Sequence, residues 1–270
     1  MLRNYLLAGS IGLILAGSLT AVADTIESVE KAIIEKTAKH TSFQGKTSST
    51  QDMLAGEMKF TSKGDMTYEF MKKGDKWLYR SEGRTKSTTV MSGQEQKSDS
   101  TVLMICDGEF LYTLTDNDGQ KMAMKTRAPD QNIMVTNKAY FDNLRKDFDL
   151  KLLPDETIDG KSTWVIEATN KQAKSMPAGT LTTMLNYFDK DSGLTIRTIG
   201  KDSTGKTVMT TNTTDIKINP TIAADRFVFK APEGVQIMDV TQQASAAGEP
   251  KAASDQQTTE QQQETEKKEK

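Results

Sequence analysis

The sequence predicts a mainly β (α+β) protein that is built on a long antiparallel sheet. Runs rich in β-branched and aromatic residues recur along most of its 270 residues, for example at 163–168 and 180–188. Short turn signals such as Asp159-Gly160 and Asp191-Ser192-Gly193 follow these runs, and connections this short only reverse a strand. Because a flat sheet would leave an apolar face and two edges in water, we expect this sheet to curve and to be covered.

The first 23 residues have the form of a secretory signal peptide. Arg3 precedes an apolar stretch that begins near Leu6, and Ala21-Val22-Ala23 supplies small residues for cleavage after Ala23. An uncleaved anchor is the alternative, but glycines and serines interrupt the stretch, which is short for a full span. No cysteine follows it, so the lipid attachment of a lipoprotein is not available. We expect a periplasmic or secreted protein.

Residues 24–40 predict one amphipathic helix, with Asp24 or Thr25 as the N-cap and Glu27 available for a capping box. We expect its apolar stripe to pack on the sheet; the alternative, a membrane-surface helix, is disfavoured by the glutamates that accompany its lysines. His40 ends this helix, and we assign it no chemistry. The stripe consists of Ile26, Val29, Ile33 and Thr37.

From residue 41 to 125 apolar and polar side chains alternate, which puts each apolar set on one face of a strand. Lys63-Gly64-Asp65, Lys73-Gly74-Asp75 and Asp107-Gly108 are predicted turns between strands. The hydrophilic residues 81–100 fit either a long loop or a polar hairpin. The alternating sets are Met58 and Phe60; Met66, Tyr68 and Phe70; Trp77 and Tyr79; Val102, Met104 and Cys106; Phe110, Tyr112 and Leu114; Met122 and Met124.

Residues 128–148 interrupt this pattern. Pro129 breaks it, and Tyr140, Leu144 and Phe148 recur at helical spacing. We expect a short helical insertion between two halves of the sheet, either a lid over its open side or a cover for its edge.

After the second run of strands, residues 225–230 predict a strand, 231–235 a turn and 237–240 a further strand. Residues 243–270 are almost entirely polar or small. Such a segment buries too little apolar area to offset its ordering entropy, so we expect a disordered tail. The folded domain is then residues 24–242.

Composition argues against several classes of function. The formal net charge is −2 with both signs interleaved, so no basic surface indicates nucleic acid. Cys106 and His40 are the single cysteine and histidine, which excludes an intrachain disulfide and most Cys/His metal sites. Cys106 lies in an apolar run and is interpreted as a buried thiol. A hydrolase using Asp189 and Asp191 is an alternative, but these lie in a turn signal without an accompanying catalytic motif. We predict neither enzyme activity nor a cofactor.

The order of these segments resembles the LolA-like superfamily of outer-membrane lipoprotein carriers. The similar pieces are ICDGEFLY at 105–112 and, most specifically, IKINP at 216–220 followed by FVFKAPEGV at 227–235. The resemblance covers about residues 24–241 and implies an incomplete β-barrel whose open side is plugged by helices. It also implies an apolar cavity that shelters acyl chains of lipoproteins in the periplasm. One departure is that residues 64–70 lack the family's early arginine, so the ligand can differ.

We therefore expect a non-catalytic carrier that binds lipid or acylated lipoprotein cargo and exchanges it with donor and acceptor proteins at membranes, in lipoprotein sorting to the outer membrane. A sensing or regulatory module of the same fold, with a lipid or protein partner, is the alternative. Alternation does not decide which strand face lines the cavity. The residues chosen as its lining are Met58, Phe60, Met66, Tyr68, Phe70, Trp77, Tyr79, Met104 and Tyr112.

Overall fold

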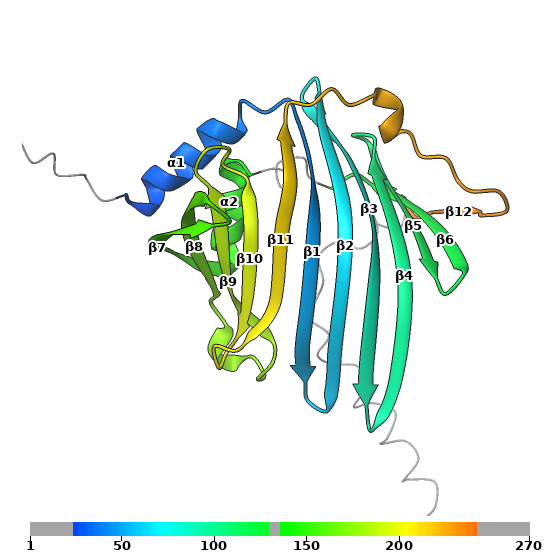
Figure 1. Ribbon diagram of the computed structural model, residues 1–270. Helices are drawn as coiled ribbons and strands as arrows, with labels where there is room; N and C mark the ends of the chain where they lie inside the picture. The colour runs from blue at the N-terminus through cyan, green and yellow to red at the C-terminus, as the bar shows by residue number, and fades with distance from the viewer. Residues whose placement is uncertain (1–23, 130–135, 242–270) are drawn as a thin grey trace, which may run out of the picture.

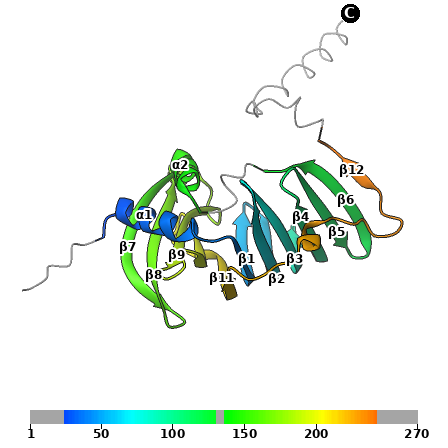
Figure 2. The same cartoon turned by 90° about the horizontal axis from the view of Figure 1, so that it is seen from above.

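The computed structural model describes residues 24–129 and 136–241 and contains, within them, one twelve-stranded sheet with two α-helices (Figure 1). The strand order is β12-β6-β5-β4-β3-β2-β1-β11-β10-β9-β8-β7, and the sheet does not close into a barrel (Figure 2). The mainly β, incomplete-barrel prediction is confirmed. The elements are α1 Ile26–Thr37, β1 Ser42–Ala55, β2 Met58–Lys73, β3 Lys76–Met91, β4 Gln94–Cys106, β5 Phe110–Asn117, β6 Gln120–Arg127, α2 Lys138–Asp147, β7 Phe148–Ile158, β8 Lys161–Asn170, β9 Leu181–Asp189, β10 Thr195–Asp202, β11 Thr207–Ile218 and β12 Ile237–Asp239, with short 3-10 helices η2 Ala173–Ser175 and η3 Ala224–Phe227.

Two antiparallel meanders make up eleven of the twelve strands of the sheet. Strands β1 to β6 form the first and β7 to β11 the second, and the pairing of β1 with β11 joins them. Turns of two residues close most hairpins; at Asp159-Gly160 both residues have positive φ, 50° and 80°. Such a turn matches the right-handed twist of the flanking strands. The predicted turn chemistry is therefore confirmed at this position.

Both α-helices pack on one face of the sheet, which we call the inner face. Val29 and Ile33 of α1 and Phe141 of α2 are almost fully buried in a core with Trp164 and Phe188. The predicted helix at 24–40 is confirmed as Ile26–Thr37, and Thr25 is its N-cap. Its capping box is completed by Ser28 instead of Glu27, because the Thr25 backbone N–H donates to Ser28 Oγ at 2.9 Å.

The face opposite the helices is also partly covered. Val165, Tyr187 and Ile196 form a second apolar core there with Ile158, at the end of β7. The turn of the β7–β8 hairpin reaches across to β10, where the Asp159 carboxylate lies 3.8 Å from the guanidinium of Arg197. Both faces of this half of the sheet therefore carry buried side chains.

Two regions of the first meander depart from the predicted pattern. Strand β2 runs without a break through Lys63-Gly64-Asp65, which was predicted as a turn. Gly64 lies beneath Thr85 of β3, whose Oγ1 would be 2.6 Å from a Cβ at that position. The glycine thus serves close packing between strands. Residues 81–100 form a polar hairpin, with its turn at Ser92 and Gly93, which settles the open choice between a loop and a hairpin.

The predicted strand at 225–230 is wrong. Residues 224–227 form the 3-10 helix η3, and the chain then crosses the outer face of the first meander without pairing. Phe227 is buried, Phe229 stacks on Tyr112 at 5.0 Å between ring centroids, and Arg226 Nε donates to Glu69 at 3.0 Å. Side-chain burial on that face fixes this segment. The strand expected at 237–240 is present as β12, parallel to β6.

The predicted signal peptide, at 1–23, and tail, at 243–270, lie outside the described residues. The helical insertion expected at 128–148 is present as α2; residues 130–135 of it lie outside the description. Among the described helices none is both long and apolar enough to cross a bilayer.

Candidate functional site

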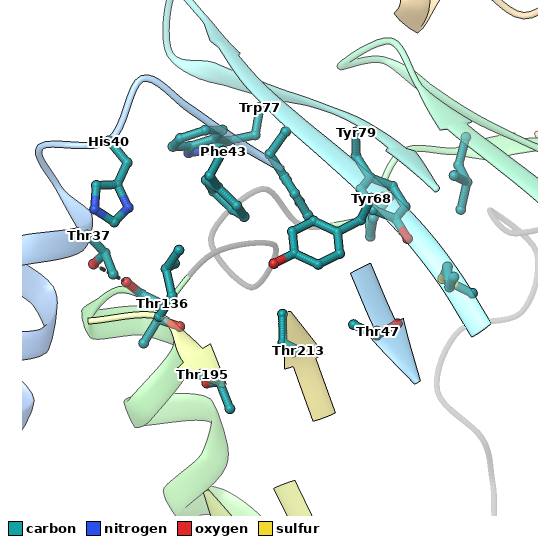
Figure 3. A pocket seen from close by; sticks show the side chains of 15 residues that line it. Thr37, His40, Phe43, Thr47, Tyr68, Trp77, Tyr79, Thr136, Thr195 and Thr213 are labelled. Carbon is teal, nitrogen blue, oxygen red and sulfur yellow. Dashed lines mark hydrogen bonds between the residues drawn. The ribbon is translucent and has the colours of Figure 1, made fainter. Parts of the chain in front are cut away.

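A cavity of about 510 Å3 lies on the inner face, between strands β1 to β3, the end of α1 and the first residues of β10 (Figure 3). Among the described residues, no lysine, arginine, aspartate or glutamate lines it. Its volume is within the range of about 300–1,000 Å3 that is usual for small-molecule sites. The lining residues are Thr37, His40, Phe43, Thr47, Met66, Tyr68, Phe70, Trp77, Tyr79, Leu111, Pro129, Thr136, Leu194, Thr195 and Thr213.

Phe43 is the centre of an aromatic cluster that forms one wall of the cavity. It stacks on Phe70 with 4.5 Å between centroids and meets Tyr68 edge-on at 6.2 Å and Trp77 at 5.7 Å. Phe70 in turn lies 4.7 Å from Tyr79. The registers Phe43–Phe70 and Phe70–Tyr79 bring these rings onto one face of three adjacent strands. The wall is therefore held by rigid strands.

Gly45 determines where the Tyr68 ring lies. The two residues are directly paired between β1 and β2, and a Cβ on Gly45 would be 2.5 Å from Tyr68 Oη and 2.8 Å from its Cζ. The ring thus lies flat over a position that has no side chain. Burial raises the pKa of the Tyr68 hydroxyl to about 12, and burial likewise raises the pKa of Tyr79. Both hydroxyls stay neutral at physiological pH.

The end of α1 closes another side of the cavity. Thr37 Oγ1 donates to the carbonyl of Thr136 at 2.7 Å, which ties the last turn of α1 to the segment before α2 (Figure 3). His40 follows at 6% exposure, and burial lowers the pKa of its imidazole. Its Nδ1 has no hydrogen-bond partner among the described residues. A neutral imidazole therefore forms part of the wall, although the sequence analysis assigned His40 no place in the site.

The two helices are also joined by charge. The Arg145 guanidinium of α2 donates to the carboxylate of Glu30 on α1, whose side chain is only 10% exposed. An ion pair with one buried member is costly to break, because removing the arginine leaves a carboxylate without its partner. This ion pair therefore links the two covering helices above the second meander.

The structure brings together five of the nine residues chosen from the sequence. Met66, Tyr68, Phe70, Trp77 and Tyr79 line the cavity, while the other four lie elsewhere.

Three of those four share the inner face without lining the cavity. Met58 and Phe60 lie further along β2, and Met104 is paired with Ser81 across β3 and β4. Tyr112 requires a correction, because it is paired with Ile105 on the opposite face and stacks on Phe229.

Phe43 and Leu111 are the apolar residues of β1 and β5 that sequence reasoning missed. Strand β1 carries few apolar side chains, so its alternation gives a weak signal around Phe43. Leu111 follows a four-residue turn that reverses which residues face inward, and this reversal also explains the error at Tyr112. The register between strands, rather than the alternation within each strand, determines which residues face the cavity.

Among the described residues there is no group of three or more histidine, cysteine, aspartate or glutamate side chains that could hold a metal ion. Asp189, proposed above for the hydrolase alternative, is buried and accepts from Ser192 Oγ at 2.7 Å. Burial alone would raise its pKa, but its hydrogen bonds and Lys161 together hold the pKa below the ordinary value. Asp189 therefore stabilises the turn between β9 and β10.

Comparison with known proteins finds similarity only at low sequence identity. No family model matches the sequence. An uncharacterized protein of Methanocaldococcus jannaschii is 25% identical over 138 residues, which cover 51% of this chain and 38% of that protein. The chain thus spans well under half the length of this curated relative.

Three solved structures illustrate the similarity in fold. MucB has 14% identity and a TM-score of 0.41, covering 78% of this chain and 64% of MucB. A LolA superfamily protein from Nitrosomonas europaea has 15% identity and a TM-score of 0.27, covering 77% and 99%. The Mycobacterium tuberculosis lipoprotein LppX has 12% identity and a TM-score of 0.36, covering 74% and 100%.

Proposed function

We propose that this protein is a non-catalytic binding protein of the cell envelope that shelters an acyl chain in the inner-face cavity. The observation that carries the proposal is the cavity itself, which has an aromatic wall and no charged side chain among the described residues that line it. Apolar area removed from water supplies the binding free energy, about 0.8 kcal/mol for each buried methylene before ordering costs are subtracted. The nine residues predicted from the sequence contribute five members of this site.

The way in which the cavity is enclosed supports the role of a carrier. Its floor belongs to continuous strands, whereas one side depends on the end of α1 and on Thr136, joined by the Thr37 hydrogen bond. Displacing that contact would widen the cavity without disturbing the sheet. The cargo is then a lipid or an acylated lipoprotein, and proteins at the donor and acceptor membranes exchange it, with the N-terminal 23 residues directing export to the periplasm.

Native mass spectrometry of the protein, exported to a bacterial periplasm and purified without detergent, tests the proposal. We expect a stoichiometric lipid or acylated peptide that is released by organic extraction. Thr47→Glu puts a carboxylate into the cavity and should abolish binding, whereas Thr50→Glu, at an exposed position on the outer face of the same strand, should retain it. Thr47→Phe occupies part of the cavity with an uncharged ring, so it should also prevent the lipid from binding.

Circular dichroism establishes that each variant is folded. A wild-type protein that is folded and empty, and that does not take up a fluorescent fatty acid, would contradict the proposal. Equal occupancy of wild type, Thr47→Glu and Thr47→Phe would show that the lipid binds somewhere else.

A further inference from the structure

Charged side chains are segregated between the two faces of the central strands. On β1 to β4 every charged residue except Lys72, next to the β2–β3 turn, points to the outer face, away from the cavity. This follows from the register, which places Ser49, Gly64 and Thr85 in one row across the sheet and alternates from there. The outward residues are Lys46, Asp52, Lys59, Lys63, Asp65, Glu69, Lys73, Lys76, Arg80, Glu82, Arg84, Lys86, Glu95, Lys97 and Asp99.

Beyond the cavity, toward the β1–β2 and β3–β4 turns, the inner face of these strands is polar but uncharged. Two successive rows of paired residues cross β1 to β4 there, and we call them the hydroxyl strip. Most of its side chains are half-buried, while the neighbouring outward positions 63, 65, 84 and 86 are exposed. The strip consists of Ser49, Gly64, Thr85 and Ser100 in the first row and Gln51, Ser62, Ser87 and Ser98 in the second.

A requirement for solubility does not explain the strip. A face that only meets water tolerates lysine and glutamate, and the outer face of the same four strands carries them in ion pairs such as Lys46–Asp215 and Arg84–Asp99. Apart from Lys72 beside the β2–β3 turn, the inner face has no charged residue over the same length of strand. Hydroxyl and amide groups both donate and accept hydrogen bonds, so this face is complementary to other uncharged hydrogen-bonding groups.

The hydroxyl strip is continuous with the cavity. Thr47 and Met66 line the cavity and are paired with each other, and Ser49 and Gly64 form the next inward pair along the same strands. From Thr47 to Gln51 the strand advances about 13 Å, at roughly 3.3 Å per residue. That length accommodates a head group of one or two rings beyond an acyl chain held in the cavity.

We propose that the hydroxyl strip binds the head group of the lipid, and that this head group is uncharged and bears hydroxyls, as a hexose does. This inference rests on the proposed acyl-chain site. Ser62, Ser87 and Gln51 would exchange hydrogen bonds with its hydroxyls. A phosphate would find no arginine or lysine on the strip to replace its lost hydration, so an anionic head group is disfavoured there.

Competition binding tests the inference with the exported protein and a fluorescent fatty acid as the displaced probe. The competitors share dioctanoylglycerol and differ in the head: galactosyl, phosphoglycerol or none. We expect the galactosyl lipid to bind at least tenfold more tightly than the phosphoglycerol lipid. Ser87→Glu should weaken the galactosyl lipid at least tenfold and leave dioctanoylglycerol within twofold, while Thr88→Glu, on the outer face beside it, changes neither.

The outcomes separate this inference from the proposed function. If all three lipids bind equally, or if Ser87→Glu leaves the galactosyl lipid unaffected, the acyl-chain site stands and the hydroxyl strip has no role in recognition. If the phosphoglycerol lipid binds most tightly, the inferred head-group class is overturned. If neither the probe nor any lipid binds, both proposals fall.

Discussion

Substituting alanine for Gly45 tests whether the position of the Tyr68 ring depends on the missing side chain. The new Cβ would lie 2.5 Å from Tyr68 Oη, so the ring must move, and the cavity that it lines offers it open space. Overpacking of this kind costs about 1–3 kcal/mol. Gly45 does not have positive φ, so alanine is allowed by its backbone and returns about 0.4–1 kcal/mol by restricting the unfolded chain.

The net expectation is a loss of up to about 2.5 kcal/mol in the free energy of unfolding. In a Tyr68→Ala background the clash is gone, so the same Gly45→Ala change should stabilise the protein by about 0.4–1 kcal/mol. Urea denaturation of wild type, both single variants and the double variant measures the coupling, which we expect at about 1–3 kcal/mol. Fatty-acid affinity should fall in Gly45→Ala as the displaced ring occupies the cavity.

A Gly45→Ala cost that is the same in both backgrounds would refute this reasoning. It would assign the clash to the other close neighbour, the Thr214 carbonyl oxygen, which would be 3.1 Å from the new Cβ.

Three further predictions concern the covering segments. Ile33→Ala removes a fully buried side chain beneath α1 and should lower the free energy of unfolding by about 2–5 kcal/mol in urea denaturation, whereas half-buried Ile34→Ala should cost less; equal costs would contradict the packing described here. Phe227→Ala should release the C-terminal segment from the outer face and speed proteolysis near residue 228. The Val228 side chain is exposed, so Val228→Ala should not have this effect. Unchanged cleavage in both variants would show that other contacts hold the segment. Because burial lowers the pKa of His40 below 6.5, the unfolded state binds the proton more readily, so the free energy of unfolding should decline as pH falls below about 6.5. His40 is the single histidine of the sequence, so His40→Gln should abolish this decline. A decline that persists in His40→Gln would assign it to other groups.

Most of the strands and turns could be predicted because their signals are local. Positive φ at turn glycines and the apolar stripe of α1 depend on residues a few positions apart. The exceptions are positions where a contact with a residue distant in the sequence determines the local secondary structure. Gly64 looks like a turn in the sequence, and only its packing under Thr85 shows why it remains in a strand. Residues 225–230 look like a strand, but burial of Phe227 on the outer face determines their path.

The site was partly predictable because the hairpin loops follow one numerical rule. The turns between β1 and β6 contain two residues, except for four between β4 and β5, so each has an even length. After a loop of even length, the residues that face inward change from odd to even numbers, or from even to odd. The inner face therefore carries odd positions on β1, even on β2, odd on β3 and, by the same rule, odd on β5. Tyr112 fails this rule and Leu111 meets it. The same rule assigns every charged residue of β1 to β4 except Lys72 to the outer face. The nearly uncharged character of the inner face can therefore be predicted from the sequence, but only once the loop lengths are known.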